Sequence, residues 1–246
     1  MGIRGEVVET ARRLVAERFP EASAAWLAGS VVLGRATTTS DLDVTVVRPA
    51  GPAYRESLEY AGWPVELFVH TADSVRTFVA RDRSRRRPTM ARLVSTGVVL
   101  VDRDGAGAAL AEECADAVAA GPPPLTVTER DALRYGLTDL LDDLAGGGDP
   151  APVAATAVAA WQQAAELLLA TEGRWGGSGK WLVRELEAYD DATGSAYTRR
   201  LHAGLVAAVG DEVDALVAVA EEVLGRAGGR LWAGYRAGAA VEGGPG

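Results

Sequence analysis

The feature that most constrains the fold of this chain is a change in sequence texture near residue 105. Before that point, short apolar runs rich in β-branched residues alternate with helical stretches. After it, Ala, Leu and Glu dominate and the β-branched alternation disappears. The first pattern is typical of a mixed sheet with helices, and the second is typical of a helical bundle. We therefore expect an α+β fold, with a small mixed-sheet domain followed by an all-helical bundle domain.

Three regions follow from this division. Residues 1–104 form the mixed-sheet domain, residues 105–125 form a helix and a proline-rich connector, and residues 126–246 form the helical domain. In the first region, the apolar pattern predicts strands at 24–27, 41–47, 63–69 and 98–101, and helices at 2–18 and 73–82. In the last region, it predicts helices at 126–145, 151–172, 180–189, 195–209 and 212–235, with a disordered tail from residue 237.

The net charge of −9 is unevenly distributed. Residues 1–104 carry 15 arginines against 13 acidic residues, whereas residues 105–246 carry 10 basic residues against 21 acidic ones. A chain this acidic lacks the positive surface typical of nucleic-acid-binding proteins, so nucleic acid is not an expected partner. The acidic helical domain is instead suited to attract a cation.

Neither a membrane span nor a secretory signal is expected. The most apolar stretch, residues 153–170, is interrupted by Gln162, Gln163 and Glu166, which indicates a buried core helix. Charged residues interrupt every apolar run near the amino terminus. The single cysteine, Cys114, excludes an internal disulfide framework and suits a reducing compartment, so we expect a cytoplasmic protein.

Chemistry is indicated most strongly by residues 25–44, AWLAGSVVLGRATTTSDLDV. An apolar strand ends at Gly29, where the missing Cβ allows close approach to the backbone. Ser30 then opens a short helical turn whose N–H groups and hydroxyl suit an anion. Asp41 and Asp43 lie two residues apart on the next strand, so both carboxylates point from the same face.

Two such carboxylates beside a phosphate-binding turn suit a Mg²⁺–triphosphate complex, because Mg²⁺ is held by one or two carboxylates together with substrate phosphates. Glu66 is a third acid, and it faces the same side if its strand neighbours that of Asp43. Its role as metal ligand or as general base is left open. The alternative is that the bend is a plain turn and the acids a capped strand entry. That alternative does not explain why two acids share one face of an apolar strand. Without a metal, their desolvation and mutual repulsion cost free energy.

Four features occur in order: Gly29-Ser30, a spacer that contains Gly34, the sequence Ser-Asp-x-Asp that ends at Asp43, and a later strand acid, Glu66. This arrangement resembles the DNA-polymerase-β-type nucleotidyltransferase superfamily. It is most similar to the bacterial branch that holds aminoglycoside nucleotidyltransferases and small stand-alone nucleotidyltransferases with a helical carboxy-terminal domain. The motifs cover about residues 20–104, and the resemblance extends to the remainder by architecture only.

The resemblance implies Gly29 and Ser30 on the triphosphate, Asp41 and Asp43 on Mg²⁺, and Glu66 as third metal ligand or catalytic base. The implied reaction transfers a nucleoside monophosphate from a nucleoside triphosphate, with ATP as the expected donor, to a hydroxyl of a small molecule. The acidic helical domain points to a cationic, aminoglycoside-like antibiotic as acceptor. The alternatives are nucleotidylation of a protein or RNA partner, as in antitoxin-type relatives, and a catalytically degenerate nucleotide-binding module. Assembly as a homodimer is left open.

Further candidates for nucleotide binding are basic or hydroxylated. Arg35 lies in the spacer, and Ser40 directly precedes the first aspartate. Lys180, the one lysine of the chain, opens a predicted helix. Related helical domains often carry a basic residue near this position that reaches the nucleotide phosphates. Lys180 or Arg184 therefore has that role or is a plain helix residue. The basic run 81–87 is either a solvated helix end or a mobile loop that attracts triphosphate.

Overall fold

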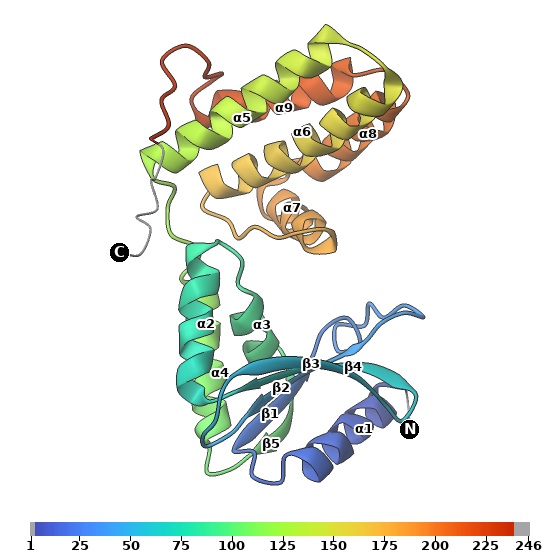
Figure 1. Ribbon diagram of the computed structural model, residues 1–246, viewed down its shortest axis with the longest axis vertical. Coiled ribbons are helices and arrows are strands. Elements are labelled where there is room, and N and C mark those ends of the chain that lie inside the picture. The colour runs from blue at the N-terminus through green and yellow to red at the C-terminus, as the bar shows by residue number, and fades with distance from the viewer. Residues whose placement is uncertain (1–2, 239–246) are drawn as a thin grey trace, which may run out of the picture. The chain divides into compact units, whose positions relative to one another are not determined.

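A computed structural model describes residues 3–238 of the chain. The chain divides into two compact units, residues 1–122 (unit 1) and residues 123–246 (unit 2), and each has its own hydrophobic core (Figure 1). The expected α+β class, with a mixed sheet followed by a helical part, is confirmed. The predicted disordered tail from residue 237 falls mainly on residues 239–246. These residues, like the predicted helix start at Gly2, lie outside the described part of the chain.

Unit 1 is a five-stranded mixed sheet with helices on both faces. The strands lie in the order β3-β4-β2-β1-β5, with β2 and β4 parallel and the other neighbouring pairs antiparallel. In chain order the elements are α1 (Ile3–Arg18), β1 (Ala24–Ala28), β2 (Leu42–Val47), β3 (Tyr54–Tyr60), β4 (Trp63–His70), α2 (Ala72–Ser84), α3 (Thr89–Ser95), β5 (Val98–Asp102) and α4 (Ala106–Ala119).

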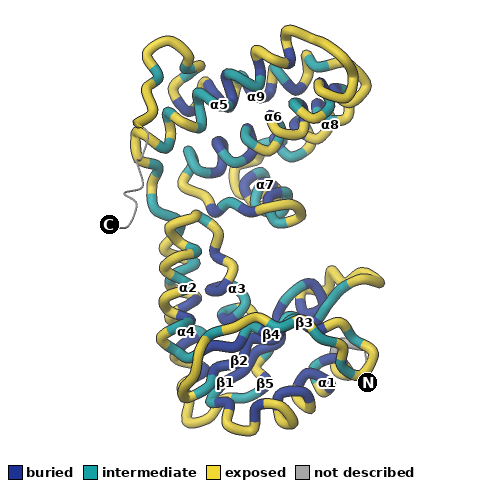
Figure 2. The backbone as a smooth tube through the Cα atoms, in the orientation of Figure 1, coloured by how far each residue is buried: buried dark blue, intermediate teal, exposed yellow. Residues whose placement is uncertain are grey.

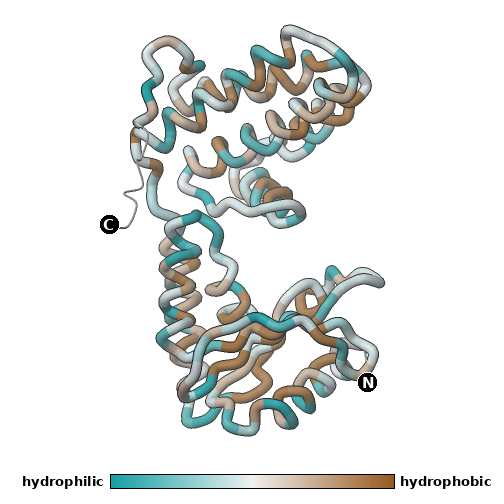
Figure 3. Tube along the Cα trace, in the orientation of Figure 1, coloured by the Kyte–Doolittle hydropathy of each residue, from teal (hydrophilic) through white to brown (hydrophobic). Residues whose placement is uncertain are grey.

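The two faces of the sheet bury different side chains, because neighbouring residues of a strand point to opposite faces. One face packs against α1, and Leu42, Val44 and Val46 of β2 are buried there. The other face packs against α2, α3 and α4, and Trp26 and Val47 are buried on it. Figure 2 shows β1 and β2 as largely buried, and Figure 3 shows the same strands as apolar. The strands that carry the site are therefore held by cores on both sides.

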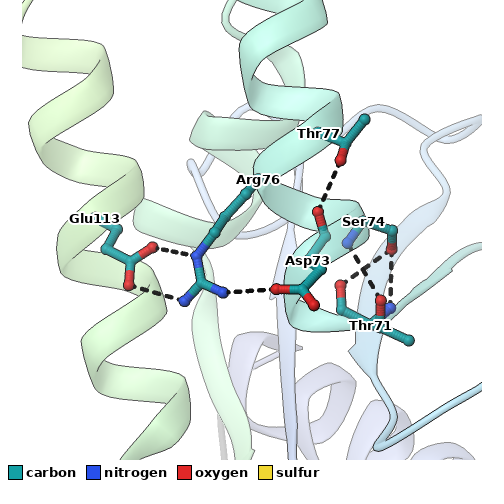
Figure 4. Close-up of polar contacts among 6 residues, drawn as sticks. All are labelled: Thr71, Asp73, Ser74, Arg76, Thr77 and Glu113. Atoms are coloured by element: carbon teal, nitrogen blue, oxygen red, sulfur yellow. Dashed lines mark hydrogen bonds and ion pairs between the residues drawn. The ribbon is translucent and has the colours of Figure 1, made fainter.

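The helix that follows the sheet, α4, packs within unit 1. It buries Leu110 and Cys114 in the core that α2 and α3 also form. Arg76 of α2 donates from Nε and Nη2 to the carboxylate of Glu113 on α4, at 2.7 and 3.0 Å (Figure 4). These hydrogen bonds lower the pKa of Glu113. The sequence texture changes at residue 105, whereas the division between the units falls at Pro122, one helix later.

The helix α2 begins close to its predicted start. Its N-cap is Thr71, whose Oγ1 accepts the N–H of Ser74 at 3.2 Å, while the N–H of Thr71 donates to Ser74 Oγ at 2.9 Å (Figure 4). This reciprocal pair is a capping box, which satisfies two backbone donors that the first turn leaves free. The cap fixes where β4 ends and the helix begins.

The sequence prediction omits β3 and α3. β3, with the sequence YRESLEY, lies at the edge of the sheet, so it needs little of the apolar alternation that marks a buried strand. α3 has seven residues, which is too short for helical periodicity to be recognised.

Unit 2 is helical over its described residues. The helices are α5 (Val127–Gly146), α6 (Pro150–Thr171), α7 (Lys180–Thr193), α8 (Tyr197–Val209) and α9 (Asp214–Ala227), and their apolar faces meet in one core. Among the described residues, α6 is the one helix long and apolar enough to cross a membrane. Side chains from Val153 to Leu169 on α6 are buried in the core of unit 2, as expected of a core helix.

The prediction of a last helix that reaches residue 235 is wrong. α9 ends at Ala227, because Gly228 and Gly229 have φ angles of +114° and +85°, a left-handed conformation that ends helices. The N–H of Gly229 donates to the carbonyl of Leu224 at 2.7 Å and closes the final turn. Two successive glycines thus outweigh the periodicity of the residues that follow.

Candidate metal and phosphate site

Three carboxylates meet where β2 lies between β1 and β4. Asp43 is the register partner of Ala28 on β1 and of Glu66 on β4. Register partners on neighbouring strands point to the same face of a sheet. Asp41, two residues before Asp43, points to that face as well. The parallel pairing of β2 with β4 is the neighbour relationship that the sequence analysis required for Glu66 to join the two aspartates.

We call Asp41, Asp43 and Glu66 the acid cluster. One carboxylate oxygen from each lies within 4.8 Å of the others, and all three residues are half-buried. Leu42 and Val44, on either side of Asp43, are fully buried against the opposite face. The burial of these two neighbours fixes the face of β2 from which Asp43 points. Carboxylates held this close in a partly desolvated place repel one another unless a cation lies among them.

Gly29 lies against the acid cluster. It has a φ of +82°, and a Cβ atom there would lie 2.0 Å from Oδ2 of Asp43. Such a distance is far inside van der Waals contact, so the Asp43 carboxylate occupies the space that a side chain would fill. The glycine thus serves two purposes: it allows the left-handed bend after β1, and it admits a carboxylate against the backbone.

The bend after β1 is a hydrogen-bonded turn. The N–H groups of Leu33 and Arg35 donate to the carbonyls of Gly29 and Ser30, at 3.2 and 2.9 Å. This pattern resembles one turn of helix, as expected, although no regular helix forms. The backbone N–H groups of residues 30–32 do not donate in the hydrogen bonds of this turn. They are the donors that the turn can offer to an anion.

Ser30 and Ser40 join the two ends of the spacer. Ser30 is buried, and its Oγ donates to Ser40 Oγ at 2.9 Å. Ser40 Oγ also accepts the N–H of Thr37 at 2.8 Å. This hydrogen bond therefore ties the bend at Ser30 to Ser40, the residue directly before Asp41. Both serines are predicted phosphate-binding residues, and both lie beside the acid cluster.

Arg55 is a residue of this site that the sequence analysis missed. It lies on β3, and its Nε donates to Oε1 of Glu66 at 2.6 Å; its Nη2 also contacts that oxygen. The Arg55 side chain is 65% exposed, whereas that of Glu66 is 15% exposed. An exposed cation thus partly offsets the negative charge of Glu66. Recognising Arg55 requires knowing that β3 pairs with β4.

The remaining candidates come from other segments of the chain. Arg35 follows the bend and is exposed. Lys180 is the first residue of α7 in unit 2 and is exposed, and Arg184, one turn later, lies over the ring of Trp181 at 4.6 Å. The phosphate-binding roles of Arg35 and Lys180 stay predictions. Arg81 and Arg83 of the basic run lie in the last turn of α2.

The acid cluster fits a divalent metal ion. Its donors are carboxylate oxygens from three residues, the hard ligands that Mg²⁺ prefers, and their mutual distances allow one cation to contact all three. The space left by Gly29 lets Asp43 reach into the bend that would carry phosphate. The candidate metal ligands on and before β2 and on β4 thus lie next to the bend that holds the candidate phosphate donors.

No protein-family model and no curated protein matches this sequence. Among solved structures, the chain is similar to a nucleotidyltransferase-like protein from Exiguobacterium sibiricum, with 14% sequence identity over 89% of this chain and 79% of that chain, and a TM-score of 0.40. A likeness this low carries no argument about activity. The function must therefore be inferred from the site itself.

Proposed function

We propose that this chain is a nucleotidyltransferase that moves a nucleoside monophosphate from a nucleoside triphosphate, with ATP as the expected donor, to a hydroxyl group of a small molecule. The observation that carries the proposal is the meeting of Asp41, Asp43 and Glu66, with oxygens within 4.8 Å of one another, against the bend at Gly29. Mg²⁺ is the expected ion, because the donor set contains only carboxylate oxygens.

Each residue has a separate task in this reaction. Asp41 and Asp43 hold the divalent ion, which when bound neutralises phosphate charge and orients the triphosphate. Backbone N–H groups after Gly29 and the hydroxyl of Ser30 receive the polyphosphate. The acceptor oxygen attacks the α-phosphorus, the bond from that phosphorus to the bridging oxygen breaks, and pyrophosphate leaves. Catalysis by such a site is mainly positioning and charge neutralisation.

Glu66 either completes the metal site or takes the proton of the attacking hydroxyl. Its hydrogen bonds with Arg55 occupy Oε1. Arg55 must therefore move away from Glu66 before that oxygen accepts a proton. Its exposed position on an edge strand gives it room to do so.

The acceptor class is inferred from the distribution of charge. The acidic balance of residues 105–246 favours a cationic, aminoglycoside-like compound. Nucleotidylation of a protein or an RNA end uses the same chemistry at the acid cluster and is the second candidate. A shift in the mass of a co-purified partner after incubation with triphosphate would identify it.

The test is release of pyrophosphate by the purified full chain with Mg²⁺, each common nucleoside triphosphate and a panel of hydroxylated acceptors, aminoglycosides first. We expect release only with a suitable acceptor, and none in the presence of a chelator. Asp41→Asn should abolish release without changing the circular dichroism spectrum. Asp104→Asn, which makes the same charge change in an exposed turn, should leave it unaffected.

Full turnover by Asp41→Asn would overturn the assignment. Triphosphate binding that is independent of metal, with no release for any acceptor, would favour a degenerate nucleotide-binding module.

A further inference from the structure

A hollow of about 280 Å³ lies beside the acid cluster, on the same face of the unit 1 sheet. Phe68 and His70 line it, and they follow Glu66 along β4 at the two-residue spacing that keeps side chains on one face. Arg55, which donates to Glu66, lines it as well. Phe68 lies two residues after Glu66 on β4, so the hollow begins roughly 7 Å from the acid cluster.

The floor of the hollow is apolar and aromatic. Phe68 and Phe78 both pack against the core under α2 and α3, and Met90 of α3 is buried. The rings of His70 and Phe78 meet edge to face, with centroids 4.8 Å apart. Burial, and to a lesser extent the charge of Arg81, lower the pKa of His70, so its imidazole is neutral at physiological pH. Such a floor suits a flat hydrocarbon ring.

The rim of the hollow is positively charged. Arg55 lies over the ring of Phe68 at 5.5 Å, and Arg81 lies over the ring of Phe78 at 4.1 Å. Asp82 is the one carboxylate among the described lining residues, and its Oδ2 accepts the N–H of Met90 at 2.9 Å. Two guanidinium groups supported on aromatic rings are well placed to bind a carboxylate or phosphate group with paired hydrogen bonds.

We propose that this hollow is the acceptor subsite of unit 1, and that it takes a small hydroxylated compound with one aromatic ring and an anionic group. The ring packs among the apolar lining of Phe68, Phe78 and Met90, the anion binds Arg81, and the hydroxyl points toward Glu66. As an acceptor subsite it rests on the proposed function. The volume admits about one ring system, which is less than a multi-ring aminoglycoside.

This charge preference is opposite to the one suggested by the acidic helical unit. The net charge of a whole unit sets the long-range potential, whereas the acceptor is selected by the groups that touch it. Arg55 adds a link between the two sites. An anion in the hollow offers the guanidinium of Arg55 a partner other than Glu66. The carboxylate of Glu66 is then free for the reaction.

The test is calorimetric titration of the full chain, without metal or triphosphate, with three compounds of one shape. They are para-hydroxymethyl benzoate, the matching neutral benzamide and the matching cationic benzamidine. We expect the benzoate to bind about tenfold more tightly than the benzamide, and the benzamidine to bind least. Arg81→Gln should reduce the benzoate affinity to that of the benzamide. Arg12→Gln, the same change on the far helix α1, should leave it unaltered.

Equal affinity for all three compounds, tighter binding of the benzamidine, absence of binding by any of them, or an unaltered benzoate affinity in Arg81→Gln would each overturn this proposal. Failure of the nucleotidyltransferase assignment appears instead in pyrophosphate release, so the two failures are distinguishable.

Discussion

Asp43 Oδ2 lies only 2.0 Å from the point where a side chain on Gly29 would begin. This relationship joins the end of β1 to the acid cluster on β2. It explains why a residue without a Cβ atom stands at that position, beyond the positive φ that also favours glycine. The carboxylate proposed to bind metal therefore lies directly against the backbone proposed to bind phosphate.

Replacement of Gly29 by alanine should therefore destroy the site more than the fold. Gly34 offers a matched control in the same spacer: its φ is +69°, but nothing lies within 4 Å of an added Cβ. Both substitutions place alanine at positive φ, at a cost of about 1 kcal/mol in the free energy of unfolding. Only Gly29→Ala must displace Asp43. We expect it to lower Mn²⁺ affinity at least about tenfold, measured by calorimetry, with little change for Gly34→Ala. Equal effects of the two variants would contradict this explanation.

Arg55 should compete with a metal ion for Glu66. Its guanidinium lies 2.6 Å from Oε1 of Glu66, so Arg55→Gln removes a positive charge beside the site. We expect Mn²⁺ affinity to rise about fivefold, or ~1 kcal/mol, which is typical for one partly exposed charge. Arg18→Gln breaks the exposed ion pair of Arg18 with Glu56 and serves as control. Lower affinity in Arg55→Gln would mean that Arg55 positions Glu66 rather than competing for it.

Cys114 should be unreactive while unit 1 is folded. Burial, with a contribution from Glu113, raises the pKa of its thiol from 9.0 to about 11. Because the thiolate is the reactive form, this shift lowers its fraction about 100-fold at neutral pH, before steric shielding. An aromatic disulfide reagent should label the native chain slowly and the urea-denatured chain rapidly, with the native rate increasing up to pH 11. Rapid labelling of the native chain would show that α4 is not packed on the sheet as described.

The part of the site that is local in sequence could be predicted, and the part that depends on the fold could not. Gly29, Ser30, Asp41 and Asp43 lie within one strand, one bend and the start of the next strand, where spacing alone indicates a shared face. Glu66 required one further assumption, that its strand is a neighbour of β2.

Arg55 and the hollow required more. They depend on an edge strand with little apolar pattern and on the seven-residue α3, neither of which leaves a periodic signal. The end of α9 shows the opposite error, since the periodicity continued past two glycines that stop the helix. The roles of Arg35 and Lys180 depend on the bound nucleotide and remain predictions.

The most direct test of the account is calorimetric binding of a nonhydrolysable nucleoside triphosphate, with and without Mg²⁺, to the natural chain, to Asp43→Asn and to the exposed control Asp104→Asn. The account predicts binding that requires Mg²⁺, is weakened at least about tenfold by Asp43→Asn and is unchanged by Asp104→Asn. Binding of equal strength in a chelator, or in Asp43→Asn, would show that the acid cluster and the glycine bend do not share a cation with the polyphosphate.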